Sequence, residues 1–233
     1  MRRFFFIFAW IAWLAGFGAG PASAQAPSAS PPSASTTAGS APQTIDGVAA
    51  RIEDDVITES EVRELGAYQQ VVEGQAKPRT ERIQELADQW IVRGEAETAN
   101  YAKPVDEDID RAYAQLVAQF TSPGEFKNKC AAAGLSEAAA RRILGQQLYL
   151  ARFLDFRFRA SAQIEEKDIE AYYNGEFSAQ LKASGQPIPA LEDVEDTIRE
   201  VLTQRAISDR ATQWLDDTRG RLKIDVMSDG DPR

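Results

Sequence analysis

The sequence contains no histidine and only one cysteine. The lack of histidine excludes sites in which an imidazole activates a serine or cysteine nucleophile, and most zinc sites as well. The chain also has neither a glycine-rich phosphate loop nor the G-x-S-x-G pattern of many hydrolases. Cys130 alone cannot form an internal disulfide. We therefore expect no enzyme activity, with no catalytic residue, no metal and no cofactor.

Basic side chains are also few. The chain carries 26 Lys and Arg residues against 36 Asp and Glu residues, a formal net charge of −10. Arg2 and Arg3 lie at the extreme amino terminus, and without them the balance is 24 against 36, a net charge of −12. Phosphate backbones bind to basic protein faces. Nucleic acid is therefore disfavoured as a partner.

The amino terminus has the three parts of a secretory signal peptide. Arg2 and Arg3 supply the positive region, residues 4–18 are apolar, and residues 22–24 (ASA) form an A-x-A cleavage site. A retained membrane anchor is the alternative, but glycines and Pro21 shorten the apolar run below the ~20 residues that span a bilayer. We expect cleavage between Ala24 and Gln25, and a mature chain that has no membrane span and lies in the bacterial periplasm.

Two further regions follow the predicted signal peptide (residues 1–24). Residues 25–43 consist almost entirely of Ala, Ser, Pro, Thr and Gly. This composition buries too little apolar surface to offset the entropy of ordering, so it predicts a disordered linker. Residues 44–227 are enough for one domain with a hydrophobic core.

The domain opens with a predicted hairpin. Val48, Ala50 and Ile52 recur with the period of two that places residues on one face of a strand, and a turn at two aspartates leads into a second strand. Thr58 and Glu61 then have the spacing of a capping box. A helix should therefore begin at Thr58.

Helical periodicity dominates the remaining sequence, and alternation returns at its end. Leu222, Ile224 and Val226 alternate with charged residues as a last strand, which we expect to pair with the first strand. The predicted fold is mainly α: an elongated multi-helix domain with a small β-sheet formed by the amino-terminal hairpin and the carboxy-terminal strand. The later predicted helices are residues 136–159, 165–173 and 190–219, after helices that follow Pro78 and Pro104.

Three segments resemble parts of the SurA family of periplasmic chaperones. Residues 46–52 (DGVAARI) and 56–62 (VITESEV) are similar to that family's opening strand and the start of its first helix. Residues 164–173 (IEEKDIEAYY) are similar to the acidic helix before its parvulin (prolyl isomerase) domain, and residues 189–226 to the long helix and closing strand after it. The matches occur in the family's order and span most of residues 44–227.

The chain departs from the family where the parvulin domain belongs. Only the fifteen residues 174–188 lie there, and the histidines of parvulin active sites are absent. The predicted domain thus has an amino-terminal part, residues 44–176, and a carboxy-terminal helix and strand, residues 187–227. The resemblance implies a chaperone that holds unfolded secreted or outer-membrane polypeptides in an apolar crevice, without ATP and without isomerase activity.

Residues 136–159 form a predicted helix with two apolar sides. Tyr149, Phe153 and Phe156 project from one side, opposite a broad aliphatic side. A helix of this kind is either sandwiched or presents one face to a ligand. The aromatic face therefore either packs under the long terminal helix or binds unfolded polypeptides. Further candidates for the same binding surface are Tyr113, Phe120 and Phe126. Each of them also fits the apolar stripe of a helix that packs on a core.

Besides the chaperone, two functions remain open. One is an envelope adaptor or structural protein with a single fixed partner, and the other is a cryptic peptidyl-prolyl isomerase. A chaperone differs from an adaptor in binding several unrelated polypeptides, because promiscuous binding needs an adaptable surface.

Overall fold

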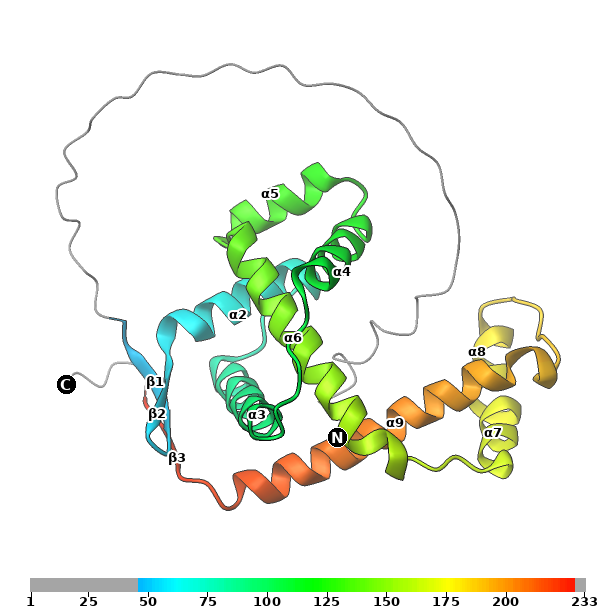
Figure 1. Cartoon of the computed structure of the whole chain (residues 1–233). Coiled ribbons are helices and arrows are strands. Elements are labelled where there is room, and N and C mark those ends of the chain that lie inside the picture. Colours follow the sequence, from blue (N-terminus) through cyan, green and yellow to red (C-terminus); the bar gives the residue numbers. More distant parts are fainter. Residues whose placement is uncertain (1–45, 229–233) are drawn as a thin grey trace.

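The computed structural model describes residues 46–228. The predicted signal peptide (residues 1–24) and linker (residues 25–43) lie outside the described residues. Figure 1 shows a helical body beside a small sheet, with one long helix that runs from the sheet to a group of short helices. The predicted mainly α fold with a small sheet is confirmed. Within residues 46–228, none of the helices combines the length and apolar character needed to span a bilayer.

The sheet brings the two ends of the described chain together. β1 (Val48–Ile52) lies between β2 (Asp55–Thr58) and β3 (Ile224–Val226), and both pairings are antiparallel. Ile52 faces both Asp55 and Ile224, one on each side. The predicted pairing of the closing strand with the first strand is therefore confirmed. Val226, at the last paired position, is exposed, so the predicted apolar face of the closing strand is only partly buried.

The helices begin where the sequence supplies caps. Thr58 precedes α2 (Glu59–Val72) and forms a complete capping box, in which its hydroxyl accepts a hydrogen bond from the Glu61 N–H and its own N–H donates to the Glu61 carboxylate. Ser122 and Ser136 cap later helices by accepting from the N–H three residues on. The later helices are α3 (Arg79–Thr98), α4 (Asp106–Ala118), α5 (Pro123–Ala133), α6 (Glu137–Phe158), α7 (Glu166–Tyr172), α8 (Ser178–Ala183) and α9 (Leu191–Arg219).

Helix α6 crosses the body and packs against α2, α3, α4 and α9 (Figure 1). Its first half contributes Leu144 to a cluster with Leu116 of α4 and Phe126 of α5. Its second half contributes Phe153 to a cluster with α3 and with Leu215 of α9. Both apolar sides of this helix are therefore covered by neighbouring helices over much of their length.

The short helices pack on the first half of α9. Helix α7 contacts α9, and Ile169 of α7 and Ile198 of α9 are each 1% exposed. Arg205 of α9 donates to both carboxylate oxygens of Glu176, at 2.8 and 2.6 Å. Residues 174–188 contain most of a wide helical turn, η3 (Tyr173–Phe177), and all of α8. They are therefore not a bare connection between α7 and α9.

A buried ion pair joins α3 to the far end of α9. Asp88 Oδ1 lies 3.0 Å from Arg219 Nε, and the two side chains are mostly buried. Burial raises the pKa of Asp88 to about 7, against the opposing effect of the Arg219 charge. Because Arg219 is the last residue of α9, this pair holds the point from which the chain returns to the sheet.

Candidate functional site

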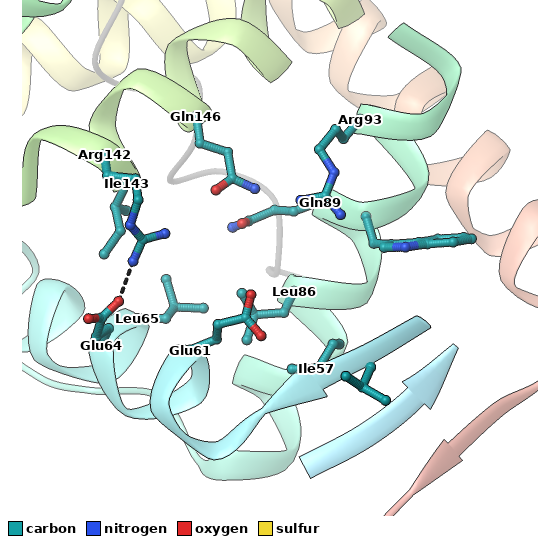
Figure 2. A pocket seen from close by; sticks show the side chains of 12 residues that line it. Ile57, Glu61, Glu64, Leu65, Leu86, Gln89, Arg93, Arg142, Ile143 and Gln146 are labelled. Atoms are coloured by element: carbon teal, nitrogen blue, oxygen red, sulfur yellow. Dashed lines mark hydrogen bonds and ion pairs between the residues drawn. The ribbon is translucent and has the colours of Figure 1, made fainter. Parts of the chain in front are cut away.

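A cleft lies between the sheet and three helices of the body. Its lining comes from β2, α2, α3 and α6, which are separate in sequence and converge around one space (Figure 2). The floor is apolar and includes Ile57, Leu65 and Ile143, each less than 9% exposed, together with half-buried Leu86. The packing of β2 against α2 and α3 positions this floor.

The cleft is small. Its volume is about 110 Å³, whereas pockets for drug-sized ligands and cofactors have volumes of about 300–1,000 Å³. An apolar cleft of this size suits one large side chain of a larger molecule. Its dimensions therefore favour contact with part of a polypeptide over a small-molecule site.

The rim of the cleft is polar. Gln89 of α3 and Gln146 of α6 extend toward each other across the opening (Figure 2). Each amide has both a donor and an acceptor, so each can bond to the peptide groups of a bound chain. Arg93 lies one helical turn after Gln89, and within residues 46–228 its guanidinium has no ion-pair partner. The rim thus offers two amides and one cation.

Other polar groups around the cleft are held in place. The Glu61 carboxylate belongs to the capping box of α2. Arg142 of α6 forms an ion pair with Glu64 of α2, which spans one side of the cleft (Figure 2). Trp90 Nε1 donates to Asp55 Oδ2 at 2.7 Å and so holds the indole beside β2. These contacts fix the helices and the strand relative to one another.

Tyr149, Phe153 and Phe156, the predicted aromatic face of α6, lie in different environments. Phe153 is 1% exposed and Tyr149 is 5% exposed, in the cluster that α6 forms with α3 and α9. Phe156 is 65% exposed. Tyr101 contacts the rings of all three, with centroid distances of 5.3–6.0 Å. In this conformation Tyr149 and Phe153 have the packing role that the sequence left open, and only Phe156 presents most of its ring to a partner.

The other three aromatic candidates form a separate group around α4 and α5. Phe126 is 4% exposed and packs against Tyr113 and Phe120, with ring centroids 5.7 and 5.0 Å apart. The Arg141 guanidinium covers the Tyr113 ring at 4.2 Å from its centroid. The structure does not bring these rings and those of α6 together on one surface. None of the six aromatic candidates lines the cleft. Their role in binding unfolded polypeptides stays a prediction.

The residues of the cleft were not predicted from the sequence. Gln89, Arg93 and Gln146 belong to no motif, and polar residues on helices are usually solvated. One signal was present in the spacing of Leu86, Gln89 and Arg93, which places an apolar residue, an amide and a cation along one face of α3. What that face meets depends on α6 and β2, which no local pattern specifies.

Comparison with models of known protein families gives no match, and a search of curated proteins gives none either. The likeness to the SurA family therefore rests on three segments, in residues 46–62, 164–173 and 189–226. A fold does not by itself define a function, so we infer the function from the site.

Proposed function

We propose that this chain is a periplasmic chaperone that binds unfolded secreted or outer-membrane polypeptides and has no prolyl isomerase activity. The observation that carries this proposal is the cleft between β2, α2, α3 and α6, which joins an apolar floor to two amides at the rim. The resemblance of three segments to the SurA family supports the same function.

The chemistry of the cleft suits polypeptides of many sequences. Peptide groups are present in every unfolded chain, so recognition by Gln89 and Gln146 requires no particular side chain. The floor adds apolar contact, which unfolded chains offer and folded proteins mostly bury. Because the cleft accommodates so little of a chain, each contact is weak, and rapid exchange between segments is expected.

Removing both rim amides should weaken binding. The double variant Gln89→Ala with Gln146→Ala is expected to bind an unfolded polypeptide about tenfold less tightly, since each lost hydrogen bond contributes about 0.5–1.5 kcal/mol. The measurement is fluorescence anisotropy with several labelled, reduced and alkylated polypeptides of unrelated sequence. The matched control is Gln84→Ala with Gln115→Ala, because both residues are exposed on helices of the body and neither lines the cleft.

Two outcomes would count against this proposal. Equal affinity in the cleft variant and the control variant would move the binding surface elsewhere. Tight binding of one polypeptide and none of the others would favour the adaptor with a fixed partner.

The mature protein is expected to leave the rate of prolyl isomerisation unchanged. The chain has no histidine, and only residues 174–188 occupy the position of the parvulin domain. The measurement is the cis-to-trans rate of a proline-containing tetrapeptide, with a parvulin as the positive control and buffer as the blank. A rate above the blank that rises in proportion to protein concentration would identify the chain as an isomerase.

A further inference from the structure

The cleft lies beside a free strand edge. β2 is an outer strand of the sheet, and among residues 46–228 no strand pairs with its other edge. Val56 of β2 lines the cleft and is 47% exposed. Edge strands present unpaired N–H and C=O groups that pair readily with another extended chain.

The hydrogen bonds of β1 show which backbone groups face that edge. The Glu53 N–H donates to Lys223 O at 3.1 Å, and Ala49 O accepts from the Met227 N–H at 2.9 Å, so the odd-numbered residues of β1 bond toward β3. Its even-numbered residues therefore bond toward β2. Val56 faces an odd-numbered residue, so its N–H and C=O point away from the sheet toward the free edge.

A chain added at this edge would place a side chain in the cleft. Ile57 is 5% exposed and its side chain forms part of the cleft floor. Residues directly opposite each other on neighbouring strands turn their side chains to the same face of the sheet. A residue opposite Ile57 on an added strand would therefore direct its side chain onto Leu65 and Leu86. Both are aliphatic, so the cleft favours an aliphatic residue there.

Arg93 indicates the charge of the group that binds in the cleft. Its guanidinium lines the cleft and has no ion-pair partner among residues 46–228, so it suits a carboxylate. Along an extended chain, the next side chain on the same face lies ~7 Å away. A cleft for one side chain therefore does not also hold an Asp or Glu side chain beside the aliphatic one. An aliphatic residue carries a carboxylate of its own only at the carboxy terminus of a chain.

We infer that the cleft captures the carboxy-terminal end of an unfolded polypeptide as a fourth strand on β2. The terminal aliphatic side chain lies on the floor beside Ile57, the backbone pairs with Val56, and the α-carboxylate lies at Arg93. This inference rests on the proposed function and specifies which part of a polypeptide the site binds.

The carboxylate is tested with two labelled hexapeptides that end in leucine, one with a free carboxylate and one with a carboxy-terminal amide. The mature protein is expected to bind the acid at least about tenfold more tightly, as for a hydrogen bond between charged groups. Arg93→Gln should remove this preference, Arg93→Lys should keep most of it, and Arg210→Gln, at an exposed residue outside the cleft, should leave it unchanged. Equal affinities for acid and amide, or an undiminished preference in Arg93→Gln, would overturn the inference.

The added strand is tested with two N-methylated forms of the acid peptide. In one form the odd-numbered peptide nitrogens are methylated, and in the other the even-numbered ones. Strand addition uses alternate N–H groups, so one form should lose binding by at least about tenfold while the other keeps it. Equal binding of both forms would exclude strand pairing.

Binding of a long alkylated polypeptide, measured on the same preparation, separates this inference from the proposed function. If the long polypeptide binds and the two hexapeptides do not differ, the proposed function stands and the terminal capture is wrong. If the long polypeptide does not bind either, the proposed function is wrong as well.

Discussion

Replacing Phe153 by Ala is expected to lower the free energy of unfolding by about 3–5 kcal/mol, the usual cost of truncating a buried phenylalanine. The side chain is 1% exposed and lies where α6 packs against α3 and α9. The structure around a truncated buried side chain relaxes only in part, so a cavity should remain. The measurement is urea denaturation followed by circular dichroism.

Phe156→Ala is the matched control for Phe153→Ala. The two residues lie on the same helix, three positions apart, but Phe156 is 65% exposed. Its truncation should change the free energy of unfolding by less than ~0.5 kcal/mol. Any effect of Phe156→Ala on polypeptide binding would then reflect the surface and not the fold. If Phe153→Ala instead left stability unchanged and weakened binding per folded molecule, Phe153 would belong to a binding surface.

Ending the chain at Gly220 is expected to cost on the order of 3 kcal/mol or more, since it removes apolar contacts and sheet hydrogen bonds together. Ile224 packs against the buried residues of the sheet, and Leu222 packs against the cluster between α3, α6 and α9. The truncation also removes Met227, whose carbonyl accepts from Arg79 at 3.1 Å. It leaves the β1 edge unpaired, and such edges promote aggregation.

The truncated protein should melt at a lower temperature and elute as aggregates on size-exclusion chromatography. A chain ending at Ser228 is the control, because it keeps all of β3 and its contacts. An unchanged melting temperature together with a monodisperse elution profile would show that β3 is dispensable.

The sequence predicted those parts of the fold that local chemistry determines. The capping box at Thr58 and Glu61 specifies where α2 begins, and Ser136 does the same for α6, because a cap acts over a few residues. The closing strand could also be predicted, since its alternation from Leu222 to Val226 leaves few possible partners. Helix α8 was not expected, because its six residues have too little periodicity to indicate a helix.

The environment of the candidate site residues could not be predicted, because it depends on how distant elements meet. Phe153 and Phe156 have the same side chain and similar neighbours in sequence. They differ because Phe153 lies in the buried cluster that α6 forms with α3 and α9, and Phe156 does not. Likewise, Gln89 and Gln146 approach each other only because α3 and α6 pack against each other. Such convergence depends on tertiary contacts and leaves no local pattern.

The pairing of β1 with β3 also determines the order in which this protein can fold. Glu53 and Lys223 hydrogen-bond across 170 positions of the chain, and contacts of such long range form late because closing a long loop costs entropy. As the chain is made from its amino end, the hairpin of β1 and β2 can form early, but the other edge of β1 waits for the last strand. A protein proposed to protect unfolded chains thus passes through an aggregation-prone stage of its own, which ends only when Ile224 and its neighbours are in place.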